Sequence, residues 1–244
     1  MVAIMKIEIS EDWLQDASRI GRAESMRYST SSSEDEGLLI FGQDNPYLTS
    51  RMKRSFDLCV ALSILLLLAP MMAAVTLLIR ATSPGSAIYR QRRRGAGGKP
   101  FTIYKFRSMY TVDDGASRLV QARRDDSRTT PVGRFLRKTS IDELPQLFNV
   151  LRNEMSLIGP RPHALSHDEF YSMHIPHYKS RFAALPGLSG LAQVNGARGA
   201  TPQIQDMEKR ISYDLTYIHK ASFSTDIKIA VATVREMFFS SSAF

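Results

Sequence analysis

Two adjacent carboxylates, Asp142 and Glu143, stand among basic residues in the segment 136–162, which reads LRKTSIDELPQLFNVLRNEMSLIGPRP. Arg137 precedes the pair and Arg161 follows it near the end of the segment. A helix is predicted to begin at the pair, which places both side chains in a first turn where free N–H groups and the helix dipole favour negative charge. The same helix end also favours an incoming phosphate. This pattern predicts phosphate chemistry, with an ionised carboxylate acting as a nucleophile or a magnesium ligand.

A purely structural interpretation of the pair competes with the chemical one. Ser140 followed by Glu143 has the spacing of a capping box, in which both residues only cap a helix. Pro145 restricts where that helix begins, because only the first helical positions can spare a backbone N–H. Starting the helix at Asp142 removes this conflict. Beyond it, apolar residues recur at helical spacing and predict a core-facing stripe of Leu144, Leu147, Phe148 and Leu151.

Two further cations lie on a predicted strand. Residues 87–91 and 101–109 are predicted to form two short strands joined by a glycine-rich hairpin connection at 95–98. Period-two alternation places Lys105 and Arg107 on one face of the second strand. Two cations on one strand face are more often solvated than functional, so this pattern by itself leaves their role open.

The elements that position these residues include an apolar segment. Residues 58–79 contain no charged residue. As a helix, this segment is long enough to cross a bilayer core of about 30 Å. Pro70 removes one helical hydrogen bond near the middle and bends the axis. Basic residues stand on both sides of the segment: Arg51, Lys53 and Arg54 before it, and Arg80, Arg90 and 92–94 after it.

A helix that spans the membrane usually has its basic excess on the cytoplasmic side only. Positive charge at both ends favours a bent segment that enters and leaves by the cytoplasmic face, with anionic head groups at both flanks. A kinked spanning helix stays open as an alternative, and a soluble core helix is disfavoured by the length. Asp57, at the start of the segment, is interpreted as a cap or as a partner for Arg54.

The chain has 244 residues. This length fits one globular domain with accessory segments. The net charge of +8 indicates acidic partners, namely a membrane surface, nucleic acid or a phosphorylated substrate. The single cysteine, Cys59, excludes an internal disulfide and suits a reducing cytoplasm. No signal peptide is expected, because the first apolar run follows some fifty residues of polar chain. Residues 1–50 are expected to form a largely disordered tail, 51–80 a membrane helix and 81–244 the globular domain that contains the carboxylate pair.

The C-terminal half contains two turn-rich motifs and two predicted helices. The motifs are PGLSG at 186–190 and QVNG at 193–196. Residues 206–217 are predicted to form a helix, and 227–239 an amphipathic helix with its basic residues on the polar side, against either the membrane or the core. Four histidines, at positions 163, 167, 174 and 177, fit no zinc spacing. They are interpreted as surface or loop residues.

The segment 136–162 closely resembles the signature of the bacterial sugar transferases, which are monotopic phosphoglycosyl transferases. The KFRSM run at 105–109 and the PGLSG and QVNG motifs also resemble elements of this family. The resemblance extends from about Arg51 to Phe239. It implies transfer of a sugar-1-phosphate from a UDP-sugar to polyprenyl (undecaprenyl) phosphate with release of UMP, the initiating step of exopolysaccharide or other surface glycan synthesis.

The resemblance also implies roles for individual residues. Asp142 would be the nucleophile that forms a covalent phosphosugar intermediate, and Glu143 would hold the metal or aid proton movement. Magnesium is the implied cofactor, with Asp142 and Glu143 as its ligands. Asp214 matches a further acid near the active site. The phosphate-binding cations would be Lys105, Arg107, Arg137 and Arg161.

The implied architecture is a small α/β, mainly α, catalytic domain with amphipathic interfacial helices and an N-terminal re-entrant membrane helix broken at Pro70. Many family members have a serine before this proline, whereas this chain has Ala69, so a break assisted by a serine hydroxyl is not expected here. The implied location is the inner (plasma) membrane, with the catalytic domain on its cytoplasmic face. Membrane lipids would then be partners together with the UDP-sugar and polyprenyl phosphate.

Two other classes of function stay open at this level. A non-catalytic, membrane-bound basic protein that recruits anionic partners would explain the charge but not the carboxylate pair. A nucleic-acid binder is disfavoured by the apolar segment and by the lack of a recognisable reader motif. The sequence does not determine which sugar is transferred or whether the chain forms a homo-oligomer.

Overall fold

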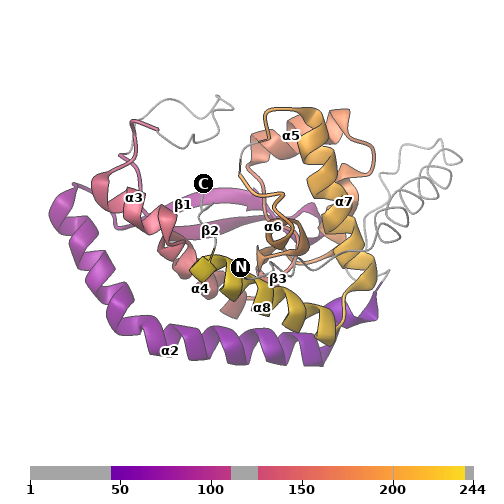
Figure 1. Cartoon of the computed structure of the whole chain (residues 1–244), viewed down its shortest axis with the longest axis horizontal. Helices are drawn as coiled ribbons and strands as arrows, with labels where there is room; N and C mark the ends of the chain where they lie inside the picture. The colour runs from indigo at the N-terminus through magenta and orange to yellow at the C-terminus, as the bar shows by residue number, and fades with distance from the viewer. Residues whose placement is uncertain (1–44, 111–125, 200, 240–244) are drawn as a thin grey trace, which may run out of the picture.

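The computed structural model describes residues 45–110, 126–199 and 201–239 (Figure 1). Its helices, with η for 3-10 helices, are η1 Pro46–Thr49, α2 Arg51–Thr82, η2 Ala96–Gly98, α3 Pro131–Lys138, η3 Ile141–Gln146, α4 Leu147–Leu151, α5 Leu165–His174, η4 Tyr178–Ala183, α6 Leu191–Val194, α7 Ile204–Lys220 and α8 Phe223–Phe239. Its strands are β1 Ile88–Arg94, β2 Pro100–Phe106, β3 Ser156–Ile158 and β4 Gly187–Ser189. A small α/β, mainly α, domain was predicted, and its mainly helical character is confirmed.

Helix α2 extends along one side of the molecule for 32 residues. It is long and apolar enough to cross a membrane, and only 17% of its most apolar window is buried against the rest of the chain. Leu66 and Leu67 are 69% and 79% exposed, which is not the burial expected of a soluble core helix. The helical assignment continues through Pro70, and Figure 1 shows that the helix bends along its course. The helix is therefore bent rather than interrupted, and its re-entrant course in a membrane stays a prediction.

The N-terminal part of α2 is fixed to the rest of the described structure by buried charges. Lys53 Nζ lies 3.2 Å from Asp57 Oδ1 and 2.7 Å from Asp226 Oδ2 on α8. The Tyr47 and Tyr217 hydroxyls each donate to Asp226 at 2.8 Å. Buried charges are tolerated only when they are paired and hydrogen-bonded. Asp57 thus pairs with Lys53 and not with Arg54, which was the expected partner.

The segment before α2 also packs against the domain. Asn45 Nδ2 donates to the carbonyl oxygens of Ile218, His219 and Ala221 at the end of α7. Asn45 thus caps a helix C-terminus whose carbonyls lack partners within the helix. Of the expected tail, residues 45–50 therefore pack on the folded part of the chain. Residues 1–44 and the loop 111–125 lie outside the described residues.

Strands β1 and β2 form the predicted hairpin, with Ile88 opposite Phe106 and Arg94 opposite Pro100. Gly97 and Gly98 connect them with φ values of 61° and 69°, in the left-handed region that favours glycine. The hairpin connection at 95–98 is confirmed. The first strand extends to Arg94, beyond the predicted end, because backbone pairing continues through its polar arginines.

A short parallel pair of strands, β3 and β4, places the end of the segment 136–162 beside the PGLSG motif. Ser156 pairs with Gly187 and Ile158 with Ser189. A Cβ atom on Gly187 would lie 2.2 Å from the backbone nitrogen of Gly159, and one on Gly190 would lie 2.3 Å from its carbonyl oxygen. The glycines of the PGLSG motif are therefore required for close backbone approach.

Gly187→Ala is expected to lower the free energy of unfolding by about 1–3 kcal/mol, because two backbone segments must separate to admit the methyl group. Gly95→Ala is the matched control, since its Cβ would meet at closest a Phe101 ring carbon at 3.2 Å. Thermal unfolding of both variants in detergent measures the difference. Equal losses in both would show that the β3–β4 approach is not tight.

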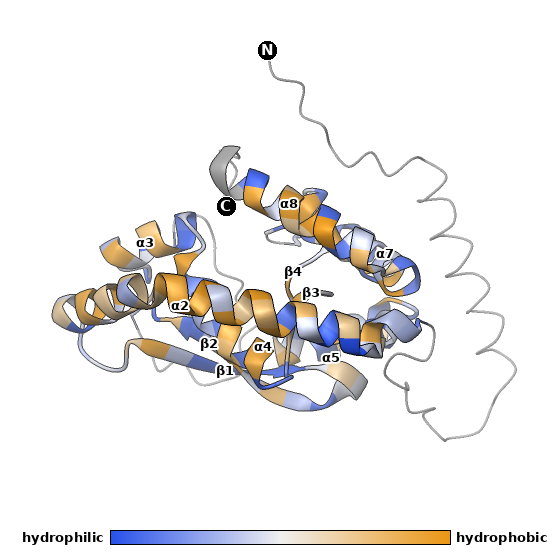
Figure 2. Cartoon of the chain, turned by 90° about the horizontal axis from the view of Figure 1, so that it is seen from below, coloured by the Kyte–Doolittle hydropathy of each residue, from blue (hydrophilic) through white to orange (hydrophobic). Residues whose placement is uncertain are grey.

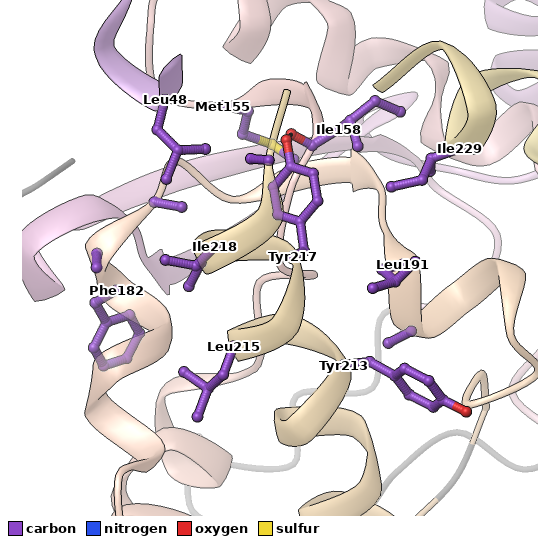
Figure 3. Packing of buried hydrophobic residues seen from close by; sticks show 14 of the residues in the cluster. Leu48, Met155, Ile158, Phe182, Leu191, Tyr213, Leu215, Tyr217, Ile218 and Ile229 are labelled. Atoms are coloured by element: carbon purple, nitrogen blue, oxygen red, sulfur yellow. Dashed lines mark hydrogen bonds between the residues drawn. The ribbon is translucent and has the colours of Figure 1, made fainter. Parts of the chain in front are cut away.

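The hydrophobic core lies around α7, whose residues Leu215, Tyr217 and Ile218 pack with Met155 and Ile158 (Figure 3). The predicted helices 206–217 and 227–239 correspond to α7 and α8, each with a few residues more. Helix α8 buries one face on this core and leaves an apolar stripe on the outside. Its exposed apolar residues are Phe223, Ile227, Val231 and Val234.

Candidate active site

The carboxylate pair lies on η3, a 3-10 helix between α3 and α4. The predicted capping box is not formed: Ser140 adopts φ 56° in the left-handed region and makes no side-chain cap. Its hydroxyl instead accepts a hydrogen bond from Arg198 at 3.0 Å. The physical reason is that two cations bind the Glu143 carboxylate, which therefore does not reach back to the cap. Of the predicted core stripe, Leu147 is fully buried whereas Phe148 is 48% exposed.

Glu143 is held by two basic residues from separate elements. Lys105 Nζ on β2 donates to Glu143 Oε1 at 2.8 Å. Arg161, in the loop after β3, donates to both carboxylate oxygens, with Nη1 3.1 Å from Oε2 and Nη2 bound to Oε1. Such a two-point contact is the strong, oriented form of an arginine–carboxylate pair. The structure thus brings two of the predicted phosphate-binding cations, Lys105 and Arg161, together at Glu143.

Asp142 has a different environment from its neighbour. Its side chain is buried, and among the described residues none donates a hydrogen bond to its carboxylate. Burial and the adjacent Glu143 charge raise the pKa of Asp142 to about 6, against the opposing effect of Lys105, Arg161 and Arg137. A helix start was expected to keep this carboxylate ionised, but a 3-10 helix of six residues does not offset its burial.

The pKa of Glu143 moves in the opposite direction. Burial alone would raise it, but Arg161 and Lys105 outweigh burial and lower the pKa well below its usual range. Two adjacent carboxylates with pKa values driven apart are typical of sites where the two groups have different tasks. Glu143 is a fixed anion that orients cations, whereas Asp142 has no hydrogen-bond donor among the described residues and is mostly ionised at pH 7.

The remaining predicted cations separate into two groups. Arg137, at the end of α3, lies near enough to lower the pKa of Asp142. Arg107 is 7% exposed and donates to the Ser83 carbonyl at 2.8 Å, the Ser83 hydroxyl at 2.7 Å and the Pro84 carbonyl at 2.6 Å. These contacts cap the C-terminus of α2. The structure therefore does not bring Arg107 together with the carboxylate pair.

Asp214 on α7 is 1% exposed and binds Arg181 on η4. Its Oδ2 accepts from Arg181 Nη2 at 2.8 Å and from Nε at 3.2 Å. Arg181 also donates to the main-chain oxygen of Arg161. Asp214 is thus connected to the carboxylate pair through two arginines rather than by direct contact.

Two arginines near the pair were missed by sequence reasoning. Arg181 carries no local signal, because a single basic residue in an irregular segment looks like a solvated side chain. Arg93 belongs to the run on β1 that was interpreted as membrane-flanking charge. Its Nε is buried without a hydrogen-bond partner in the described structure. Burial and the nearby Arg161 lower the pKa of Arg93 to about 10. Alternation along the strand was the available signal for an inward-facing arginine.

His163 lies in a loop, which is one of the two expected settings, but it is buried rather than at the surface. It is 5% exposed, and its Nδ1 lies 2.7 Å from the Tyr178 hydroxyl and 2.8 Å from Arg181 Nη1. Burial and the Arg181 charge lower the pKa of His163 well below 6.5, so the ring is neutral. In residues 45–110, 126–199 and 201–239 no group of three His, Cys, Asp or Glu side chains is arranged to hold a metal ion.

Comparison with known proteins shows to which family this chain belongs. The family model described as bacterial sugar transferase matches residues 48–240, which include all the site residues above. The chain belongs to this family. The predicted membership is confirmed, and the transferase interpretation is favoured over a non-catalytic basic membrane protein.

Three relatives of this bacterial sugar transferase illustrate the likeness. It is 48% identical over 192 residues to a UDP-glucose:undecaprenyl-phosphate glucose-1-phosphate transferase of Caulobacter vibrioides, covering 79% of this chain and 72% of the relative. It is 45% identical to a protein of the same description from Escherichia coli K12, covering 79% and 41%. It is 40% identical to a UDP-N-acetylgalactosamine-undecaprenyl-phosphate N-acetylgalactosaminephosphotransferase of Aeromonas hydrophila, covering 75% and 43%. The chain thus spans less than half the length of the last two relatives.

Proposed function

We propose that this sugar transferase moves a sugar-1-phosphate from a UDP-sugar to undecaprenyl phosphate, with release of UMP, as the first step of exopolysaccharide synthesis. The single observation that carries this is the divided carboxylate pair, in which Glu143 holds two cations and Asp142 accepts no hydrogen bond from the residues that the structure describes. The relatives named above support the substrate classes. UDP-glucose is the donor to test first, because it appears in the names of relatives at 45–48% identity.

The chemistry assigned to Asp142 has two steps. A carboxylate oxygen attacks the β-phosphorus of the UDP-sugar, an O–P bond forms, and the bond from that phosphorus to the bridging oxygen breaks, so that UMP leaves with the electron pair. A phosphate oxygen of undecaprenyl phosphate then attacks the same phosphorus and releases the carboxylate. The product is the lipid-linked diphosphate sugar. Such a sequence is ping-pong and splits one difficult transfer into two easier ones.

The cations around the pair stabilise negative charge on the transferring phosphoryl group. Arg161 and Lys105 are oriented by Glu143, and Arg137 contributes a third positive charge near Asp142. Preorganised cations act strongly in a site with little water, because they need no rearrangement during reaction. Arg107 has no such task in this proposal, since it caps α2.

Magnesium fits this site as an ion that arrives with the substrate. Asp142 and Glu143 are hard oxygen donors, and magnesium in phosphate-transfer sites usually takes one or two carboxylates together with substrate phosphates. These two residues would hold the ion. When bound, it neutralises diphosphate charge and favours UMP as the leaving group. Glu143 would then share its oxygens between the ion and its two cationic partners.

The membrane arrangement proposed here rests on α2 and α8. Both lie on the same side of the molecule, and Figure 2 shows them as the most apolar helices of the face seen from below. Their exposed apolar residues include Leu66, Leu67, Ile227 and Val231. A bent α2 that enters and leaves by the cytoplasmic face of the inner membrane, with α8 lying in the interface, would cover this surface. It would also bring a water-soluble donor and a membrane-bound acceptor to one site.

Neighbouring residues of α8 provide a test of its contact with lipid. Single cysteines at Ile227 and Lys228, each in a Cys59→Ser background, are labelled with a fluorophore in nanodiscs that contain brominated lipid. Stronger quenching is expected at position 227, because the apolar stripe enters the acyl region while the lysine side chain points to the head groups. Equal and weak quenching at both positions would place α8 away from the membrane.

The proposed reaction is tested by measuring UMP release by the detergent-solubilised protein with magnesium, undecaprenyl phosphate and UDP-glucose. UDP-galactose and the two N-acetylated UDP-hexosamines are measured in parallel. Release with at least one donor, dependent on the acceptor for continued turnover, supports the proposal. No release with any of these donors would contradict it.

A further inference from the structure

Arg181 stands at the centre of a buried polar network beside the carboxylate pair. It is 3% exposed. Its guanidinium donates to Asp214 Oδ2 from both Nε and Nη2, at 3.2 and 2.8 Å, and to the main-chain oxygen of Arg161. Its Nη1 lies 2.8 Å from His163 Nδ1. One side chain thus connects α7 with two residues of the loop 159–163.

The network satisfies the charge of Arg181 from several directions. Asp214 is its direct partner, Asp168 Oδ1 lies 3.8 Å from Nη1, and the Tyr178 hydroxyl lies at 3.4 Å. Both carboxylates are 2% exposed or less. A planar guanidinium with five donors can bind a carboxylate and a carbonyl at the same time, whereas the ammonium of lysine is a point charge. Replacing Arg181 by lysine therefore keeps the charge and removes this simultaneous contact.

Arg161 is held at both ends by this arrangement. Arg181 binds its main-chain oxygen, and Glu143 binds its guanidinium. Pro160 and Pro162 flank Arg161 and restrict the backbone on both sides. The position of the Arg161 guanidinium is therefore determined by where its main chain is fixed.

We infer that Arg181 is a positioning residue of the transfer reaction: together with Asp214 it fixes the Arg161 main chain so that the Arg161 guanidinium meets Glu143 and the substrate phosphates. This rests on the proposed function. Asp214 then acts through Arg181, and it does not touch the substrate as an acid. The family resemblance placed Asp214 near the active site, and its contacts assign it a different task.

A double-mutant cycle tests this inference. Arg181→Lys is expected to lower kcat/KM for UMP release by about 10²-fold, because a displacement near 1 Å at a phosphate-binding group has an effect of that size. In an Arg161→Lys background the same substitution is expected to cost less than about threefold, because the residue through which it acts has already been changed. An equal loss of about 10²-fold in both backgrounds would overturn the inference.

The control for general destabilisation is Arg54→Lys. Arg54 donates to the Val150 and Leu151 carbonyls, at 2.7 and 3.0 Å, and so loses a comparable pair of backbone contacts away from the network. It is expected to lower Tm as much as Arg181→Lys does while keeping kcat/KM within about threefold of wild type. If Arg181→Lys does not fold, Asp214→Asn takes its place in the cycle, since it keeps the shape and an acceptor oxygen.

A measurement without turnover separates this inference from the proposed function. The Nε–Hε resonance of Arg161 in ¹⁵N-arginine-labelled protein is assigned from its loss in Arg161→Lys. Arg181→Lys and Asp214→Asn are expected to shift or broaden it, and Arg54→Lys is expected to leave it unchanged. An unchanged Arg161 signal in both network variants would overturn the positioning role. Failure of wild type to release UMP would contradict the proposed function instead, and the resonance still decides whether Arg181 positions Arg161.

Discussion

Asp142→Asn is expected to abolish UMP release, by at least about 10³-fold in kcat, while the protein remains folded. An amide has no nucleophilic carboxylate oxygen, so the first O–P bond is not formed. The substitution is nearly isosteric. It also removes a buried negative charge that lies next to the negative charge of Glu143. Stability is therefore expected to be retained. Steady-state UMP release and thermal unfolding of the same preparation measure both effects.

Asp206→Asn is the matched control for this substitution. Asp206 is exposed in the first turn of α7, where its carboxylate accepts a hydrogen bond from the Gln203 backbone nitrogen at 3.2 Å. Removing this charge is expected to cost at most about 1 kcal/mol of stability and to leave kcat unchanged. If Asp142→Asn retains more than a small fraction of wild-type turnover, Asp142 is not the nucleophile.

Glu143→Gln is expected to lower kcat/KM by about 10²–10³-fold, because Lys105 and Arg161 lose the anion that orients them. It also changes the pH profile in a defined direction. The Glu143 charge raises the pKa of Asp142, whereas Lys105 lowers it. In wild type the acid limb of kcat/KM is expected near pH 6, where Asp142 gains its proton and activity falls. In the residual activity of Glu143→Gln this limb moves to lower pH.

Lys105→Met is expected to shift the pKa of Asp142 in the opposite direction. Loss of this cation is expected to raise the pKa of Asp142, so that the acid limb moves to higher pH. The two variants are compared from pH 5 to 8 with donor, acceptor and magnesium held constant. Shifts in the same direction, or no shift in either variant, would mean that a group other than Asp142 sets the acid limb.

The features that could be predicted from the sequence are those encoded by local pattern. The hairpin follows from its glycine connection, α2 from its uncharged apolar run, and α7 and α8 from helical periodicity. The site pair was recognisable because two carboxylates adjoin in a basic segment. Lys105 and Arg161 were assigned to phosphate binding through the resemblance; the structure places both against Glu143, and their phosphate-binding role stays a prediction.

The features that could not be predicted depend on tertiary contacts. Lys105 and Arg107 were predicted to share a strand face, yet β2 ends at Phe106, and one side chain binds Glu143 while the other binds the C-terminal carbonyls of α2. Alternation gives a side chain its face but not its partner, and here the end of α2 lies against one part of that face only. The burial of His163 likewise could not be predicted, because it depends on contacts with Arg181 and Tyr178, which are distant in the sequence.

Proline gives a further example of this limit. The residue pattern predicted that Pro70 bends the apolar helix, since a proline removes one backbone hydrogen bond and crowds the preceding turn, whereas the resemblance implied a break there. The helix accommodates that loss by bending and continues to Thr82. Sequence identifies where a bend is required, whereas the direction of the chain after the bend depends on what lies around it.

The most direct measurement on this transferase is intact-protein mass spectrometry after a rapid acid quench. Wild type and Asp142→Asn are incubated with magnesium and UDP-glucose, or another donor that supports UMP release, in the absence of undecaprenyl phosphate. Wild type is expected to gain the mass of one sugar phosphate, to release one equivalent of UMP and to lose the added mass when the acceptor is supplied. Asp142→Asn is expected to gain nothing. UMP release that requires the acceptor from the start, with no adduct on wild type, would contradict a covalent intermediate on Asp142.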